Sequence, residues 1–209
     1  MLFKTFVKYL KERKGAIHIG AHVGVERDWY KQEGFSPVLW FEPNKRIFEW
    51  LLNNLSGYLD NTAYCLGVHD TLKKAILHVA SNKGQSSSIL LFGTHALYRP
   101  DIRFVRHEEI ELVRMDEFIK LKEIDITKYN FLNIDVQGVE LNVLKSFGEL
   151  LKQFDYIYTE VNEEQLYRGG CLVGQIDSYL EMFEFVRVET CMTKHKWGDA
   201  FYIKKSLLV

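Results

Sequence analysis

The chain has 209 residues, of which 47% are apolar and 14% aromatic, enough to build one domain around a real hydrophobic core. Its net charge of -1 and its scattered basic residues argue against a general nucleic-acid or membrane-surface binder. Cys65, Cys171 and Cys191 lie far apart and form no C-x-x-C pair, so neither a disulfide framework nor a zinc site is expected, and a reducing cytoplasm is the simplest setting.

Residues 1–14, within "MLFKTFVKYLKERKG", place apolar side chains at helical spacing, interrupted by lysines. This pattern predicts an amphipathic N-terminal helix that packs on the domain, with contact to a partner or a membrane as the alternative. The stretch lacks the uninterrupted apolar run of a signal peptide, and we expect no segment that spans a bilayer.

Strands and helices then alternate along the chain. The expected strands are residues 16–20, 38–42, 63–67, 75–80, 109–113, 130–135, 155–161, 185–189 and 200–204. The expected helices are residues 22–33, 44–54, 139–150 and 172–183. This alternation predicts a single α/β domain over residues 1–209, with a mostly parallel sheet covered by helices on both faces. The last two strands have no helix between them, which predicts a C-terminal antiparallel hairpin.

Residues 81–106 are the least regular part of the chain and contain "NKGQSSS" and "GTHALYRPDIR". Irregular segments of this length are usually functional or disordered. We expect this loop insertion to act partly as a lid over a binding site. Ser87 and Ser88 are candidates for hydrogen bonds to a cofactor or an acceptor, with a plain polar turn as the alternative.

The first strand–turn–helix unit, "AIHIGAHVGVERDWY", carries Gly20 and Gly24. Gly20 permits a sharp turn that brings a ligand close to the backbone, and Gly24 permits close packing of the following helix. A dinucleotide site has the pattern G-x-G-x-x-G, in which the central glycine makes room for a pyrophosphate. His22 occupies that position here, so a pyrophosphate would be crowded. A purely structural turn remains the alternative.

The second strand, in "VLWFEPN", ends at Glu42. An acidic residue at the tip of this strand accepts hydrogen bonds from ribose hydroxyls in nucleotide-binding sheets. The alternative is a solvated carboxylate that caps the helix starting at Asn44. Together, the glycine turn and the acidic tip favour a ribose-bearing ligand without a pyrophosphate, of which S-adenosylmethionine is the common one.

The segment "FLNIDVQGVELNVLKS" changes from strand spacing to helical spacing at Asp135, Gln137 and Gly138. Asp135 is expected at the carboxyl end of a central strand, facing the ligand crevice. Gly138 permits the tight turn into the next helix. Glu140 falls in the first helical turn, where a negative charge suits the helix dipole.

With these stretches in place, the chain resembles the FkbM-type family of S-adenosylmethionine-dependent O-methyltransferases. The segments that carry the resemblance are "IHIGAHVG", "FEPNKRIFEWLLNNL", "AYCLGV", "GQSSSIL", "VRMDEFI", "FLNIDVQGVELNVLKS", "YTEVNEEQLYRG" and "HKWGDAFYIKK". The resemblance implies a seven-stranded class I (Rossmann-like) methyltransferase sheet and a hydroxyl acceptor, often on a sugar or a glycan-linked precursor. His18 departs from the family's usual acidic residue, His22 from its usual Asn, and Gln137 from its common Glu.

Site residues follow from these patterns and from the resemblance. We expect the cofactor to contact Gly20, Ala21, His22, Gly24, Glu42, Pro43, Gly67 and Asp135. We expect the acceptor to contact Ser87, Ser88, Asn162, Tyr167 and Arg168.

Three strand-tip residues are candidates for catalysis, because an alcohol needs a base to become a good nucleophile: Asp135, Glu160 and His195. The alternative for His195 is a loop histidine bonded to Asp199, and His18 is expected to be a satisfied core histidine. No bound metal is expected, although Asp135 and Glu160 are a conceivable pair of cation ligands.

The expected function is therefore S-adenosylmethionine-dependent O-methylation of a small-molecule or glycan acceptor in the cytoplasm, without nucleic acid as a partner. Two alternatives stay open. One is a nicotinamide-dependent oxidoreductase, which the missing central glycine disfavours. The other is a catalytically silent cofactor-binding scaffold, which His18 and Gln137 leave possible.

Overall fold

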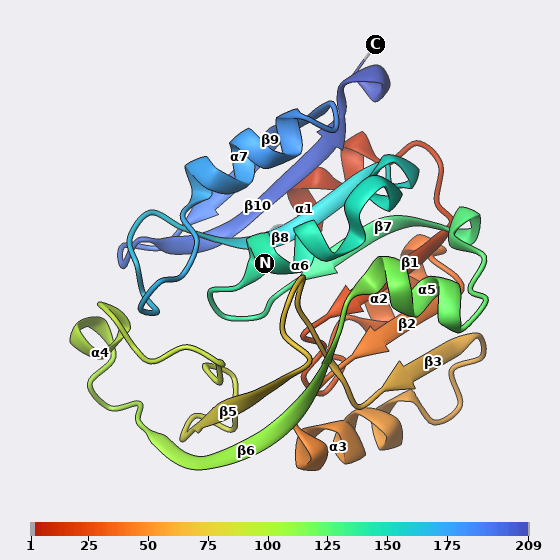
Figure 1. Ribbon diagram of the computed structural model, residues 1–209. Helices are drawn as coiled ribbons and strands as arrows, with labels where there is room; N and C mark the ends of the chain where they lie inside the picture. The colour runs from red at the N-terminus through yellow and green to blue at the C-terminus, as the bar shows by residue number, and fades with distance from the viewer. Residues whose placement is uncertain (1–2, 209) are drawn as a thin grey trace.

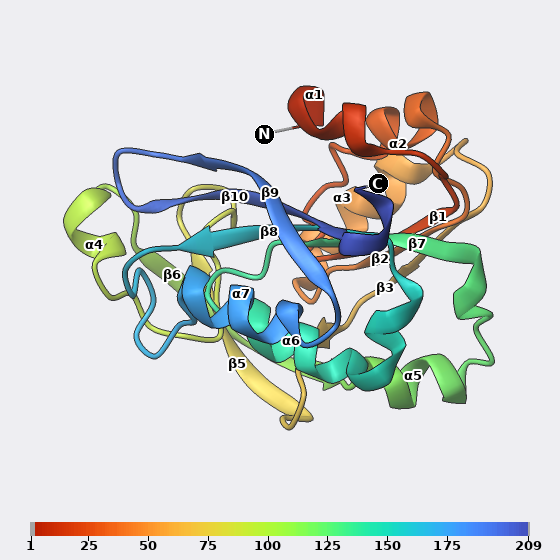
Figure 2. The same cartoon turned by 90° about the horizontal axis from the view of Figure 1, so that it is seen from above.

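A seven-stranded sheet lies between two layers of helices in the computed structural model, which describes residues 3–208 (Figures 1 and 2). The strand order is β3-β2-β1-β7-β8-β10-β9. The strands of this sheet are β1 (Gly15–Ile19), β2 (Val38–Phe41), β3 (Asn61–Tyr64), β7 (Tyr129–Ile134), β8 (Tyr156–Asn162), β9 (Phe185–Met192) and β10 (Trp197–Lys204). The five strands from β3 to β8 in this order pair in parallel, whereas β10 runs antiparallel to both β8 and β9. The predicted α/β class, the mostly parallel sheet and the C-terminal hairpin are confirmed.

Each face of the sheet has its own apolar core. On one face lie α1 (Phe3–Phe6), α2 (Arg27–Glu33) and α3 (Lys45–Leu55), and on the other lie α5 (Met115–Leu121), α6 (Glu140–Phe147) and α7 (Val173–Glu181) (Figure 2). The 3-10 turns are Val7–Tyr9, Ile126–Lys128, Gly148–Gln153 and Lys205–Leu207. Buried residues such as Phe6, Tyr30 and Leu51 fill the first core, and Phe118, Leu144 and Leu180 fill the second.

The N-terminal helix is shorter than the predicted residues 1–14, of which the first two lie outside the described residues. After α1 and a 3-10 turn, the backbone becomes extended at Leu10. The ring of Phe6 stacks on that of Phe201 in β10 with centroids 4.1 Å apart. The helix therefore packs on the sheet, as its amphipathic pattern predicted.

The second helix begins at Arg27 rather than at residue 22. Gly20, His22 and Gly24 all adopt left-handed backbone conformations, with φ of 81°, 47° and 67°. Residues with positive φ cannot continue a right-handed α-helix. The glycine turn thus extends over several residues that periodicity alone assigned to the helix.

A second, three-stranded sheet has the order β4-β6-β5 and comprises β4 (Gly67–Val68), β5 (Lys74–Ala80) and β6 (Phe104–Val113). The predicted strand at residues 63–67 is therefore divided between two sheets. β6 begins five residues before the predicted strand at 109–113 and takes in the last part of the predicted insertion.

Residues 81–103, which connect β5 to β6 and include α4 (His95–Tyr98), form a segment that we call the roof. Backbone hydrogen bonds join it to the loop that follows β8: Gly93 N–H to Leu166 O at 2.6 Å, and Arg168 N–H to Leu91 O at 2.8 Å. The roof is thus held at both of its ends by β-strands and in its middle by a second loop. Within residues 3–208, no helix has the length and apolar character to cross a bilayer.

Candidate active site

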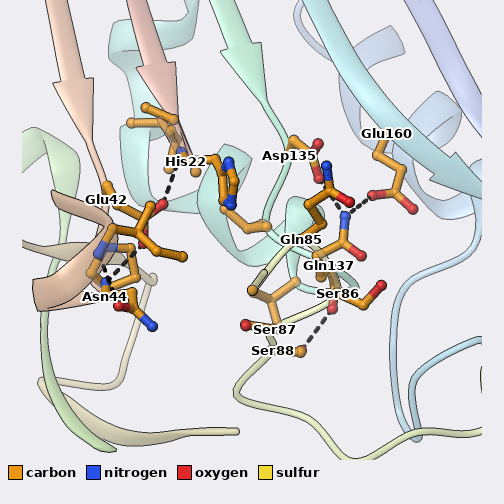
Figure 3. A pocket seen from close by; sticks show the side chains of 18 of the residues that line it. His22, Glu42, Asn44, Gln85, Ser86, Ser87, Ser88, Asp135, Gln137 and Glu160 are labelled. Atoms are coloured by element: carbon orange, nitrogen blue, oxygen red, sulfur yellow. Dashed lines mark hydrogen bonds between the residues drawn. The ribbon is translucent and has the colours of Figure 1, made fainter. Parts of the chain in front are cut away.

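A cavity of about 990 Å³ lies at the carboxyl ends of β1, β2, β7 and β8, beneath the roof (Figure 3). The strand order reverses between β1 and β7, and ligands of open α/β sheets bind at such a reversal. This volume lies at the upper end of the range for small-molecule sites. The cavity has room for a nucleoside cofactor and an acceptor together.

The glycine turn brings the ends of two strands into contact. A Cβ added to Gly20 would lie 1.8 Å from the backbone oxygen of Asp135, so only glycine fits between β1 and β7. Gly24 instead faces α3, where an added Cβ would lie 2.6 Å from Leu51 Cδ1. Gly20 therefore shapes the cavity floor, whereas Gly24 allows close packing behind it.

At one end of the cavity, the Glu42 carboxylate is buried and held by the main chain. Its Oε2 accepts a hydrogen bond from the His22 N–H at 2.9 Å, and its Oε1 accepts one from the Asn44 N–H at 2.8 Å. Burial raises the pKa of Glu42 to about 7, and the negative charge of Asp135 contributes in the same direction. Each oxygen keeps a further lone pair that is able to accept a hydrogen bond from a ligand hydroxyl.

Asn44 lines the cavity beside Glu42 and begins α3. Its Oδ1 caps the helix by accepting the Ile47 N–H at 3.1 Å. Its Nδ2 is buried and has no hydrogen-bond partner among the residues that the structure describes. A buried donor without a partner costs free energy, which a bound acceptor atom would recover. Glu42 and Asn44 together present the acceptors and the donor that suit a ribose or a nucleoside.

At the other end, Asp135 and Glu160 lie on either side of Gln137 (Figure 3). Gln137 Nε2 donates to Asp135 Oδ1 at 2.5 Å and also to Glu160 Oε2, while its Oε1 accepts the hydroxyl of Tyr167 at 2.6 Å. Burial raises the pKa of Glu160 well above its usual range, and the charges of Asp135 and Glu140 raise it further. A carboxyl group with a raised pKa beside open cavity is suited to proton transfer.

Behind the glycine turn, His18 is buried in a polar network. Its Nδ1 lies 3.3 Å from the hydroxyl of Tyr30, which in turn accepts a hydrogen bond from Asn133 Nδ2 at 2.9 Å. Burial lowers the pKa of His18 to about 3, so the ring is neutral at physiological pH. Glu26 Oε2 lies 4.0 Å from the same ring nitrogen, and burial raises its pKa to about 7. Both residues contribute to the cavity wall.

The sequence model described as the methyltransferase FkbM domain matches residues 18–191, which is most of the chain. The chain belongs to the FkbM methyltransferase family. The residues at both ends of the cavity, from Glu42 to Glu160, fall inside the matched region.

A curated relative of this FkbM methyltransferase is the 2-O-methyltransferase NoeI of Sinorhizobium fredii, which is 26% identical over 153 residues. The alignment covers 70% of the present chain but only 62% of NoeI, which is less than two thirds of that protein. The fold resembles M. capricolum TrmK bound to S-adenosyl-homocysteine, with a TM-score of 0.56, 9% identity, and coverage of 98% of this chain and 68% of TrmK. It also resembles a precorrin-6y C5,15-methyltransferase from Geobacter metallireducens, with a TM-score of 0.53, 11% identity, and coverage of 98% and 87%. These structural neighbours are class I methyltransferases by fold.

Most of the predicted site residues of the FkbM methyltransferase do line the cavity. They are Gly20, Ala21, His22, Glu42, Pro43, Gly67, Ser87, Ser88, Asp135, Glu160 and Tyr167. Both serine hydroxyls are used by the protein itself, since Ser87 Oγ accepts the Ala80 N–H at 3.0 Å and Ser88 Oγ donates to Gln137 O at 2.7 Å. The serines thus hold the roof and the cavity floor in place.

Four predicted residues, namely Gly24, Asn162, Arg168 and His195, are not among those that line the cavity. Gly24 faces Leu51, as described above. Asn162 is buried at the end of β8, and Arg168 Nε donates to the backbone oxygen of Phe92 at 3.1 Å, so it ties the roof to the loop after β8.

His195 lies at the tip of the β9–β10 hairpin, at the same end of the molecule as α4 (Figure 2). Its ring stacks on Trp197 with centroids 5.2 Å apart and lies 5.0 Å from the ring of Tyr98. Both strands of the hairpin are longer than predicted, so their tip extends past the cavity. His195 therefore does not border the crevice with Asp135, and we do not retain it as the base.

Sequence reasoning missed several polar residues of the cavity wall, notably Glu26, Asn44 and Asp199. The pattern N-x-x-I at Asn44 identifies a helix cap, but it does not indicate that the amide nitrogen lacks a partner. Asp199 pairs in register with Glu160 across β10 and β8, which only the sheet topology reveals. Among residues 3–208 there is no group of three or more His, Cys, Asp or Glu residues placed to hold a metal ion.

Proposed function

We propose that this FkbM methyltransferase transfers a methyl group from S-adenosylmethionine to a hydroxyl group of a sugar or glycan precursor. One observation carries the proposal. Glu42 and Asn44 lie side by side next to the glycine turn, and in that turn His22 takes the place of the glycine that would make room for a pyrophosphate. The curated relative is named a 2-O-methyltransferase, and the TrmK structure holds S-adenosyl-homocysteine, which supports this choice of cofactor and acceptor atom.

His22 distinguishes this site from a dinucleotide site. His22 lines the cavity, and its Nε2 lies 2.9 Å from the backbone oxygen of Lys83 in the roof. The side chain therefore occupies the space that a central glycine leaves for a pyrophosphate. This arrangement disfavours a nicotinamide-dependent oxidoreductase, while Glu42 still accepts ribose hydroxyls and Asn44 Nδ2 still donates to an acceptor atom of the nucleoside.

S-adenosylmethionine supplies a methyl group in a displacement that leaves the carbon–sulfur electron pair on sulfur. In our proposal, the Glu160 carboxylate takes the hydroxyl proton as the new oxygen–carbon bond forms. Asp135 accepts a hydrogen bond that orients the acceptor, and Tyr167 and the roof exclude water. A positioned base of this kind accelerates such a step by roughly 10²–10⁴-fold. We place the reaction in the cytoplasm, in keeping with three thiols that form no disulfide.

The proposal is tested by incubating the protein with S-adenosylmethionine and a panel of nucleotide-sugars and glycans, and by measuring S-adenosylhomocysteine. Calorimetry with S-adenosylmethionine and with NAD runs in parallel. We expect binding of the first and not the second, and turnover with at least one hydroxyl acceptor. Binding of NAD instead would favour the oxidoreductase, and cofactor binding without turnover on any acceptor would favour a silent scaffold.

A further inference from the structure

Gln137 is held in an unusual backbone conformation that directs its side chain into the cavity. Its φ is 60°, a left-handed value that is uncommon for a residue other than glycine. Ser88 Oγ donates to its backbone oxygen at 2.7 Å, and the N–H of the following Gly138 is held by Glu140 Oε1 at 2.9 Å. Strained residues that their surroundings hold this firmly are concentrated at functional sites.

The partners of the Gln137 amide fix its orientation. Gln137 Nε2 is the amide atom that faces Asp135 and Glu160, so the amide offers one N–H to each of these carboxyl groups. The amide oxygen then faces Tyr167, whose hydroxyl donates to it at 2.6 Å.

Several negative charges lie close to Glu160 and disfavour its ionised form. Asp135, Glu140 and Asp199 all act on it with negative charge from three different elements, and the buried hydroxyl of Tyr167 also lies near it. Neighbouring carboxylates of this kind often share a divalent cation. Here the NH₂ group of Gln137 lies between Asp135 and Glu160 instead.

We propose that Gln137 is a positioning residue whose side-chain amide holds Asp135 and Glu160 in place of a cation. The inference rests on the proposed function, because Glu160 is the base of that reaction. The N–H group that faces Glu160 carries a partial positive charge, which favours the ionised form of Glu160, and the two N–H groups together fix the carboxylate oxygens that face the acceptor. Tyr167 contributes indirectly, because its hydroxyl donates to the Gln137 amide oxygen and so fixes the orientation of the amide.

The first test replaces Gln137 by Glu, which keeps the shape but exchanges the two donors for a third carboxylate. Mn²⁺ binding to the protein without cofactor is measured by calorimetry and by electron paramagnetic resonance. We expect the Gln137→Glu variant to bind Mn²⁺, with at least a tenfold gain in affinity over wild type. Gln153→Glu, which adds the same charge at an exposed site, is the matched control and is expected to behave as wild type.

The second test follows the titration of Glu160 by ¹³C NMR of protein labelled at the glutamate side-chain carboxyl carbon, with Glu160→Gln to assign the signal. Gln137→Met removes both donors at similar size and is expected to move the Glu160 midpoint upward by about one pH unit. Tyr167→Phe keeps the ring, releases the amide, and is expected to give a smaller upward shift. Thermal unfolding of each variant confirms that it is folded.

Wild-type affinity for Mn²⁺ in Gln137→Glu, together with an unchanged Glu160 midpoint in the folded Gln137→Met and Tyr167→Phe variants, would overturn the inference. Neither measurement uses cofactor or acceptor. If the wild-type protein turned over no acceptor and yet the variants behaved as expected, the proposed function would fail while the role of Gln137 stood. If wild type turned over an acceptor while the variants kept the wild-type Mn²⁺ affinity and Glu160 midpoint, the proposed function would stand and the role of Gln137 would fail.

Discussion

The two ends of the cavity hold their carboxylates by different means. Glu42, at the end that we propose binds the nucleoside, accepts hydrogen bonds from two backbone N–H groups, those of His22 after β1 and Asn44 after β2. Glu160, at the end that we propose binds the acceptor, accepts a hydrogen bond from the side chain of Gln137, whose amide oxygen accepts the hydroxyl of Tyr167. Main-chain donors survive any substitution except proline, and their positions follow from local turn geometry. The side-chain donors at Glu160 come from separate segments of the chain, so a single substitution can remove one of them.

The largest effect is expected at the acceptor end, from Glu160→Gln. If Glu160 is the base, kcat should fall by roughly 10²–10⁴-fold, whereas affinity for S-adenosylhomocysteine should stay nearly unchanged. Turnover assays and calorimetry measure the two quantities. Asp199→Asn, which removes a charge from the register partner of Glu160, is the control and should cost far less. Wild-type kcat in Glu160→Gln would show that the base lies elsewhere.

Glu26 is another carboxylate of the cavity wall, and it differs from Glu42 and Glu160 because its neighbour at 4.0 Å is the neutral ring of His18. Burial raises its pKa from 4.5 to about 7, so the folded state prefers the protonated form. The stability that this gives is present below about pH 4.5 and is lost as the pH rises to about 7.

Relative to Glu26→Gln, wild type should therefore lose up to about 3 kcal/mol of unfolding free energy between pH 4.5 and pH 8, measured by urea denaturation. Glu117→Gln, at an exposed position of α5, is the control. A difference between wild type and Glu26→Gln that is the same at every pH would mean that Glu26 does not titrate in this range.

A smaller effect is expected at the nucleoside end, from Glu42→Ala. Loss of hydrogen bonds from ribose hydroxyls to a charged group should weaken S-adenosylhomocysteine binding by about 10- to 100-fold, or roughly 1.5–3 kcal/mol. Glu42→Gln keeps one acceptor oxygen and should lose less. Calorimetry on protein whose thermal unfolding is otherwise normal measures both. If Glu42→Ala bound S-adenosylhomocysteine as tightly as wild type, Glu42 would serve only to hold the turn through its hydrogen bonds to the main chain.

The difference between the two ends of the cavity also explains which features the sequence could predict. The sheet, the glycine turn and Glu42 belong to contiguous βα units, in which hydrophobic periodicity and turn chemistry determine the geometry. His195 was misassigned because its position depends on how far β9 and β10 extend before they turn. The sequence does not place Asp199 or Glu26 at the cavity, because only the pairing of strands and the packing of α2 bring them there. The roof was recognised as an insertion, but its hydrogen bonds to the loop after β8 join residues far apart in the chain.

The central claim is that the nucleoside lies on Glu42 while the methyl-transfer chemistry occurs beside Asp135 and Glu160. A crystal structure of the protein with S-adenosylhomocysteine tests it most directly. We expect both ribose hydroxyls within hydrogen-bond distance of the Glu42 carboxylate, an atom of the nucleoside accepting from Asn44 Nδ2, and the sulfur facing Asp135 and Glu160. A ribose bound away from Glu42, or a sulfur that faces away from Glu160, would contradict the account.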